Sequence, residues 1–190
     1  MLGRGISLVK SKICDQLGDK FGDQLRDMVM RSKRAGEREY GQTFCRKGDK
    51  LEYIKSECVG SECEISANEI RLCDRDNTSV FVHTHPGEEM GVLSDADVKA
   101  AKVMKMSAIC AIGNDGLSMM CMDGIQKLKG EDLLTLDQLN QKIRGETDWQ
   151  YLKTGYDEIS ADTVLTTEWI LFDEFAKKVP RVSLCRRVLK

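Results

Sequence analysis

The sequence contains no apolar run that approaches the length of a membrane span, and it has no large excess of charge of either sign. A formal net charge of -2 provides no general basic field that could hold a phosphate backbone, so we expect neither a membrane nor a nucleic acid as a partner. The first residues carry Lys10, Lys12 and Asp15 before any signal-like apolar segment develops. These absences predict a cytoplasmic protein whose partner is another protein.

Closely spaced cysteine pairs are also absent. The eight cysteines are scattered along the chain without the CxxC spacing of a structural zinc site or a redox motif. The segment from Cys58 to Cys63, followed by Cys73, leaves a disulfide or a second metal site open. Reduced thiols are the simpler expectation for a cytoplasmic protein.

Histidine is scarce, and its placement is uneven. Only two histidines occur in 190 residues, and both lie in the segment FVHTHPGEEMGVLSDAD over 81–97. The β-rich run over 80–82 predicts a buried strand that ends at Pro86, one of only two prolines. Side chains two residues apart on a strand point to the same face, so His83 and His85 should present both imidazoles to one side.

A helix should begin directly after this segment, because Ser94 suits the N-cap and acidic residues follow it. Asp97 then lies in the first turn. Two imidazoles and a carboxylate leave a fourth position for water, which is the pattern of catalytic zinc, so the sequence predicts Zn²⁺ bound by His83, His85 and Asp97. A plainer alternative is that Ser94 and Asp97 only cap the helix, since the pair resembles a capping box with Asp in place of Glu.

The remaining pattern predicts an α/β fold with a mixed β-sheet flanked by helices. We divide the chain near residue 130 into a domain over 1–130 and a helical C-terminal extension over 131–190, which could mediate self-association into a homo-oligomer. The expected elements are, in order, a helix over 6–29, strands over 37–46 and 51–58, a short strand over 69–73, a strand over 79–83, a helix from 94, strands over 108–112 and 117–122 with a tight turn at 114–116, and helices over 133–143 and 164–175.

Taken together, these residues resemble the signature of the JAMM, or MPN-plus, zinc metalloproteases of the JAB/Mov34 type. That signature is a glutamate on an earlier strand, then HxHP, a gap of seven residues and SxxD; here the two parts read HTHP over 83–86 and SDAD over 94–97. The order of predicted elements agrees over about residues 7–125. The resemblance implies an MPN-type fold, which is a cytidine-deaminase-like sandwich, and zinc-dependent hydrolysis of a peptide or isopeptide bond. The implied substrate is a protein that carries ubiquitin or a ubiquitin-like modifier.

The resemblance also implies roles for four residues: the zinc ligands His83, His85 and Asp97, and the oxyanion-stabilising hydroxyl of Ser94. The base should be a glutamate on a neighbouring strand. Glu37 and Glu39 are both candidates, because residues two apart on a strand point the same way. Many family members have a glycine three residues after the glutamate, whereas Gly41 lies two after Glu39 and four after Glu37. We select Glu39, which lies further inside the predicted strand, and keep Glu37 as the alternative.

Several other readings compete with this one. Phosphoesterases and amidohydrolases that begin with an HxH pair need further histidines downstream, and zinc nucleobase deaminases need H-x-E with PCxxC; the chain has neither. Two alternatives remain: a catalytically silent MPN-type scaffold in a protein complex, and a zinc peptidase that processes a linear precursor such as a sulfur-carrier protein. The intact ligand set favours an enzyme over the scaffold.

Overall fold

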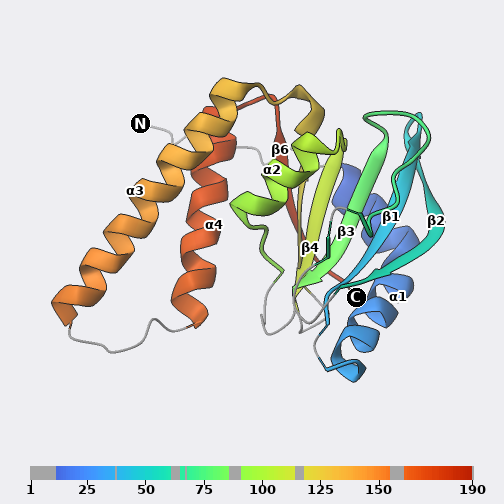
Figure 1. Ribbon diagram of the computed structural model, residues 1–190, viewed down its shortest axis with the longest axis horizontal. Helices are drawn as coiled ribbons and strands as arrows, with labels where there is room; N and C mark the ends of the chain where they lie inside the picture. The colour runs from blue at the N-terminus through green and yellow to red at the C-terminus, as the bar shows by residue number, and fades with distance from the viewer. Residues whose placement is uncertain are drawn as a thin grey trace, which may run out of the picture.

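The computed structural model describes residues 12–36, 38–60, 65–66, 68–85, 91–113, 118–154 and 161–189. Its strands form one six-stranded sheet of order β2-β1-β3-β4-β5-β6 (Figure 1). Only β3 and β4 are parallel neighbours, and every other neighbouring pair is antiparallel. The predicted α/β class with a mixed sheet is therefore confirmed.

The secondary structure follows the predicted order over most of the chain. The elements are α1 (Lys12–Arg34), β1 (Tyr40–Lys47), β2 (Lys50–Val59), β3 (Ser79–His85), α2 (Asp95–Val103), β4 (Ala108–Gly113), β5 (Ser118–Asp123), the short 3-10 helix η1 (Ile125–Lys127), α3 (Gly130–Thr154), α4 (Ala161–Lys178) and β6 (Ser183–Val188). The hairpin of β4 and β5 is confirmed by their antiparallel pairing, while its predicted turn at 114–116 lies outside the described residues.

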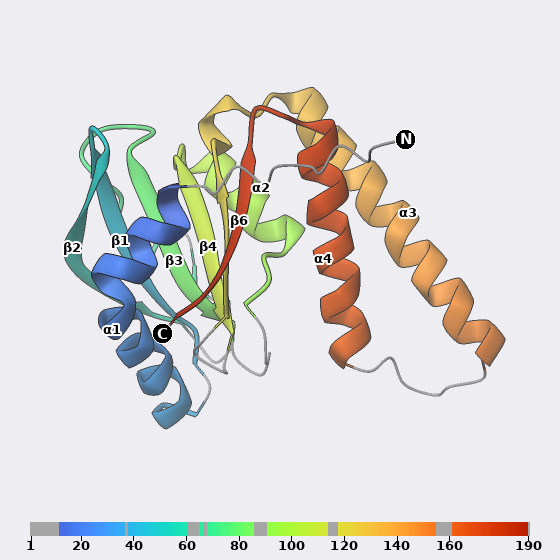
Figure 2. The ribbon, with the colours of Figure 1, turned by 180° about the vertical axis from the view of Figure 1, so that it is seen from behind.

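Helices cover both faces of the sheet, so the core has two parts. On one face α1 packs over Val80, Val82 and their neighbours on the adjoining strands. On the other face α2, α3 and α4 pack over Phe81 and the alternate side chains of β4 and β5 (Figures 1 and 2). β3 is buried on both faces, as its uninterrupted β-rich sequence predicts.

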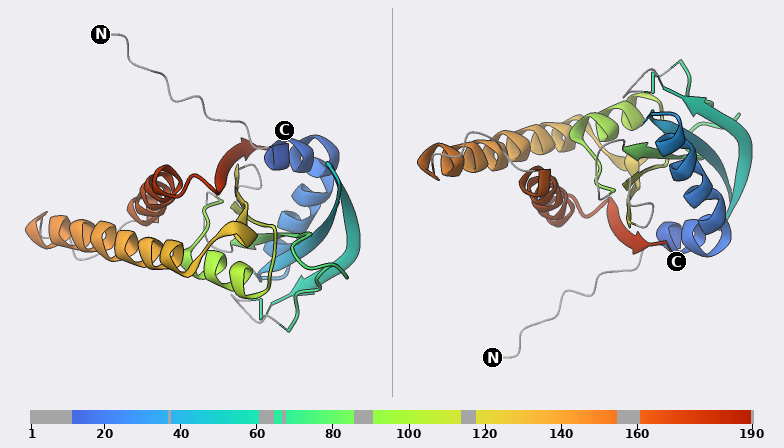
Figure 3. Two further views of the ribbon diagram at one scale, coloured as in Figure 1. Left: turned by 90° about the horizontal axis from the view of Figure 1, so that it is seen from above. Right: turned by 90° about the horizontal axis from the view of Figure 1, so that it is seen from below.

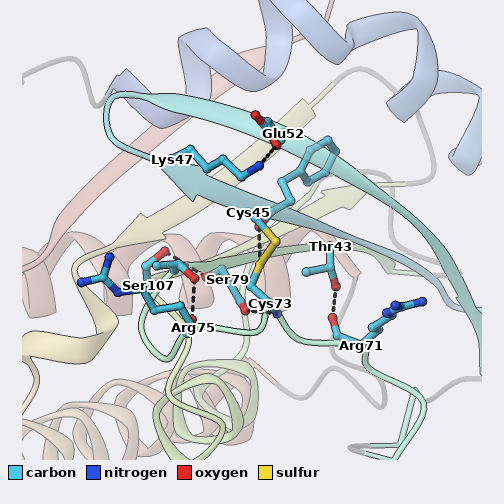
Figure 4. The surroundings of a disulfide bond; sticks show 11 residues. Thr43, Cys45, Lys47, Glu52, Arg71, Cys73, Arg75, Ser79 and Ser107 are labelled. Atoms are coloured by element: carbon cyan, nitrogen blue, oxygen red, sulfur yellow. Dashed lines mark hydrogen bonds and ion pairs between the residues drawn. A yellow bond between two sulfur atoms is a disulfide. The ribbon is translucent and has the colours of Figure 1, made fainter.

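The predicted strand over 69–73 is wrong. This stretch forms no strand, but it crosses the face of β1 that is turned toward α2. We call residues 65–66 and 68–73 the strap. Thr43 Oγ1 donates to Arg71 O at 2.6 Å, and a disulfide joins Cys45 to Cys73 (Figure 4). One disulfide and side-chain hydrogen bonds take the place of a strand ladder, which explains why an extended sequence pattern is present without a strand.

The C-terminal extension is not wholly helical, contrary to the prediction. It contains α3 and α4, which run side by side and extend away from the sheet (Figure 3), but it ends in β6, which pairs with β5. The sequence of β6 hides this strand because Arg186 and Arg187 interrupt its apolar pattern. Arg186 lies over the Trp169 ring at 3.4 Å, and Arg187 pairs with Asp15 of α1 at 3.1 Å. The sheet thus contains strands from both sides of residue 130, where the secondary structure changes.

The expectation of reduced thiols holds for Cys58, which is a free and buried thiol, but is wrong for Cys73, while Cys63 lies outside the described residues. Three disulfides are present among the described residues: Cys14–Cys185, Cys45–Cys73 and Cys110–Cys121. The partners are 171, 28 and 11 residues apart, so their pairing depends on the folded sheet and leaves no local spacing signal. None of the described helices is long and apolar enough to cross a membrane.

Removing the disulfide that joins the two ends of the chain should destabilise the fold strongly. We expect the double variant Cys14→Ser/Cys185→Ser to lose about 2–5 kcal/mol in free energy of unfolding, because the bond closes a very long loop in the unfolded chain. The Cys45–Cys73 bond closes a shorter loop, so the variant Cys45→Ser/Cys73→Ser should lose about 1.6 kcal/mol less free energy of unfolding by the chain-entropy relation. Urea denaturation without reductant measures both losses, and a larger loss for the second variant would contradict this account.

Candidate metal centre

The two histidines lie at the C-terminal end of β3 and face the helical layer of α2. His83 is buried and His85 is partly buried. Their rings are tilted against each other with centroids 4.8 Å apart, and their Nε2 atoms approach to 2.9 Å. The alternation of a regular strand therefore brings both nitrogens to one point, as the sequence predicts.

Asp97 reaches the same point from the N-terminus of α2. Ser94 is the N-cap and forms a capping box with Asp97: its Oγ accepts from Asp97 N at 3.1 Å, and its backbone N donates to Asp97 Oδ2 at 2.7 Å. This box turns the carboxylate back toward β3. Asp97 Oδ1 lies 3.2 Å from His83 Nε2, and Asp97 Oδ2 lies 3.4 Å from His85 Nε2. The capping role of Ser94 is thus confirmed, and it is compatible with a metal site because it turns the Asp97 carboxylate toward the histidines.

Glu39 directly precedes β1, and its side chain approaches the histidines. The register pairs Gly41 with His83, so Glu39, two residues earlier, lies on the same face. Its Oε1 is 3.6 Å from His83 Nε2, and its Oε2 accepts from the backbone N of Ile65 in the strap at 2.7 Å. One carboxylate oxygen is therefore held by the strap while the other faces the histidines.

The separations between these donor atoms fit a small cation. Around tetrahedral zinc with Zn–N and Zn–O distances near 2.05 Å, neighbouring ligand atoms lie about 3.3 Å apart. The two Nε2 atoms are 2.9 Å apart, and the Asp97 carboxylate lies 3.2 Å from His83 Nε2 through Oδ1 and 3.4 Å from His85 Nε2 through Oδ2. Glu39 also lies within 4.8 Å of both histidines, so a second ligand set with Glu39 is possible by distance alone. The Asp97 oxygens lie closer to the histidines than the nearer oxygen of Glu39, which makes Asp97 the better placed of the two candidate ligands.

Burial and charge act in opposite directions on the two carboxylates. Burial raises the pKa of Glu39, and the charges on His83 and His85 only partly oppose this. Burial also acts to raise the pKa of Asp97, but the charge and hydrogen bond of His83, followed by those of His85, outweigh it and hold that pKa well below its usual range. Of the two carboxyl groups, Asp97 is therefore the more readily ionised and Glu39 the more readily protonated.

Phe81 supports the orientation of His83. The two rings are stacked with centroids 5.7 Å apart and planes 10° apart. This arrangement needs a glycine on the neighbouring strand, because a Cβ at Gly41 would lie 2.3 Å from Phe81 Cζ. Gly41 therefore makes room for the Phe81 ring, which stacks on His83.

Substitution of Gly41 by alanine should destabilise the protein by about 1–3 kcal/mol, because the added methyl group forces Phe81 out of its place. It should also weaken zinc binding, since the stacked ring no longer fixes His83. The matched control is Gly145→Ala, at an exposed helical site with nothing within 4 Å, where we expect a gain of up to about 1 kcal/mol. Urea denaturation compares both variants, and equal stabilities for the two would contradict the packing argument.

Every predicted site residue that the structure describes lies at this point: Glu39, His83, His85, Ser94 and Asp97. Glu37, the alternative base, and residues 86–90 lie outside the described residues. Sequence reasoning missed the contributions of Ile65, whose backbone holds Glu39, and of Phe81. A backbone donor has no sequence signal, whereas Gly41 beside a strand glutamate could have indicated a tight contact.

No family model matches this chain, and no curated protein or solved structure does. The comparisons assign no family.

Proposed function

We propose that this protein is a zinc-dependent hydrolase of peptide or isopeptide bonds, built on an MPN-type fold as in the JAMM metalloproteases. The observation that carries the proposal is the convergence of His83 Nε2, His85 Nε2 and the Asp97 carboxylate, whose Oδ1 lies 3.2 Å from His83 and whose Oδ2 lies 3.4 Å from His85, with Glu39 beside them. Two imidazoles and one carboxylate are a borderline-soft donor set that suits Zn²⁺ and leaves a coordination position open.

Zinc would lower the pKa of water toward neutrality and would polarise the carbonyl group of the scissile bond. The chain itself must then move protons. Glu39 is suited to this task because Oε1 faces the site while the strap holds Oε2, so the carboxylate keeps one orientation. In this proposal Oε1 accepts a proton from the attacking water and later returns it to the amine that leaves.

Ser94 would assist at the carbonyl oxygen. Its hydroxyl donates to Asp97 Oδ2 at 2.8 Å. To donate to the oxyanion of a substrate, the hydroxyl must turn away from this carboxylate. The backbone N of Ser94 also donates to Asp97 Oδ2, so Asp97 keeps one capping bond during that change. We therefore propose Ser94 as an oxyanion donor whose resting role is the helix cap.

The proposed substrate is a protein conjugated to a ubiquitin-like modifier, and a direct cleavage assay tests this. Zinc-loaded protein is incubated with a modifier linked through a lysine side chain and with the same modifier fused in linear form. We expect release of the free modifier, loss of release with a chelator, and recovery on addition of zinc. Cleavage of only the linear fusion would favour processing of a precursor. If the zinc-loaded protein cleaves neither, the scaffold alternative takes the lead.

We also propose a cytoplasmic location. The three disulfides argue against it, because the thiol-reducing systems of the cytoplasm usually keep cysteines reduced. Alkylation of thiols in intact cells, followed by peptide mapping, distinguishes a reducing compartment from an oxidising one. Labelled Cys45 and Cys73 would support a reducing compartment, and unlabelled ones would place the protein in an oxidising one.

A further inference from the structure

A cluster of sulfur atoms lies on the face of the sheet opposite the histidines. β4 pairs Cys110 with Cys121 of β5, and β5 pairs Cys121 with Cys185 of β6, so these three cysteines form one row across neighbouring strands. Cys14, in the first turn of α1, lies over the row and is bonded to Cys185. We call Cys14, Cys110, Cys121 and Cys185 the four-cysteine cluster.

The two disulfides of this cluster are not separate. The Sγ atoms of Cys14, Cys121 and Cys185 all lie within 4.8 Å of one another, and the Sγ of Cys110 is bonded to that of Cys121. All four side chains are buried and belong to the part of the core beneath α1. Four cysteines from four different elements therefore meet at one closed point.

From this geometry we infer that the four-cysteine cluster, when reduced, is a second metal site that binds a soft divalent cation such as Zn²⁺ through four thiolates. Sulfur ligands about 2.3 Å from tetrahedral zinc lie about 3.8 Å from one another. The Sγ atoms of Cys14, Cys121 and Cys185 lie within 4.8 Å of one another and reach this spacing with small rotations of the side chains, and Cys110 is held beside them by its bond to Cys121. One cation above Cys121 could be reached by Cys110 and Cys185 from either side and by Cys14 from the helix.

Metal binding at the four-cysteine cluster requires two steps, which are reduction of both disulfides and deprotonation of the thiols. A dithiol reductant gives each disulfide two electrons and its own two protons and itself becomes a disulfide. A phosphine reductant gives two electrons and takes the oxygen of one water to become a phosphine oxide, and the two protons of that water complete the two thiols. Binding of the cation then displaces four thiol protons and leaves a tetrathiolate complex with a net charge of -2. The position of Cys14 in the first turn of α1 helps to stabilise this charge, because the positive end of a helix favours thiolates.

A structural rather than a catalytic site is expected here, since four sulfur ligands leave no open position and the cluster is closed to solvent. Its effect would be to tie α1 and β6 to the sheet after the covalent bonds are lost. The third disulfide offers a matched control, because Cys45 and Cys73 belong to no such cluster among the described residues. The inference does not depend on hydrolytic activity.

Cobalt spectroscopy tests the second site directly. The double variant His83→Ala/His85→Ala, which removes the first site, is reduced with a phosphine under inert gas, and one equivalent of Co²⁺ is added. We expect intense thiolate-to-cobalt charge-transfer bands, clearly weaker bands in a further Cys121→Ser variant, which keeps three of the four thiolates, and full intensity in Cys45→Ser/Cys73→Ser. Zinc should displace the cobalt and raise the Tm of the reduced protein as its concentration increases.

A reduced protein that is folded by circular dichroism but shows no charge-transfer band would overturn the inference, and so would a band of unchanged intensity in Cys121→Ser. Thiolate bands do not arise from histidine or carboxylate ligands. Reduced wild-type protein therefore gives the same readout where the histidine variant does not fold. The unreduced protein should give no such band.

Discussion

Exchange of Asp97 for asparagine should remove the metal while leaving the protein folded. The asparagine side chain keeps one oxygen that can accept from the backbone N of Ser94, so the helix cap survives. Its amide nitrogen replaces the second carboxylate oxygen, and the charge that a zinc ligand provides is lost. Wild-type protein that is loaded with zinc and desalted without reductant should retain about one zinc per chain, and Asp97→Asn should retain almost none.

The neighbouring acid provides the control for this experiment. Asp95 lies in the same first turn of α2 but pairs with Lys99 at 2.8 Å. Asp95→Asn makes the same change of charge next to the same cap, and we expect it to keep its zinc. Retention of zinc by both variants would remove Asp97 from the ligand set and would favour the set that contains Glu39.

Replacement of Glu39 by glutamine should lower turnover by about 10²–10⁴-fold while zinc is retained, which is the usual contribution of a general base. The amide oxygen of glutamine can still accept from Ile65 N, so the side chain should keep its place. It cannot accept a proton from water. Turnover is measured on whichever modifier substrate the wild-type protein cleaves, together with zinc content.

Glu69 is a suitable comparison, because its carboxylate also accepts from a backbone N, that of Ser66 at 2.7 Å, yet it lies on the exposed part of the strap. Glu69→Gln should keep nearly full turnover. Turnover of Glu39→Gln within a few-fold of wild type would transfer the role of base to Glu37 or exclude the scheme.

The parts of the site that depend on short-range patterns could be predicted from the sequence. The two-residue spacing of His83 and His85 on a buried strand fixes their common face, and Ser94 with Asp97 three residues later fixes the start of α2. These local rules place all three candidate ligands at the same end of the sheet, because α2 begins near the end of β3.

Features that depend on long-range pairing could not be predicted. β6 joins the sheet only because β5 offers a free edge and because Trp169 and Asp173 accommodate Arg186. The bond between Cys14 and Cys185 needs α1 and β6 to be adjacent first. The strap has the sequence pattern of a strand because its apolar side chains can pack on the core with or without strand pairing. In each case the deciding partner lies far away in the sequence.

The most direct test of the central claim is X-ray absorption at the zinc edge of unreduced wild-type protein that carries one equivalent of zinc. In this state the four-cysteine cluster is closed by its disulfides, so zinc should occupy only the histidine site. The account predicts nitrogen and oxygen ligands at about 2.0–2.1 Å, with the outer scattering of two imidazoles. Sulfur scattering at about 2.3 Å, or a folded protein that retains no zinc, would contradict it.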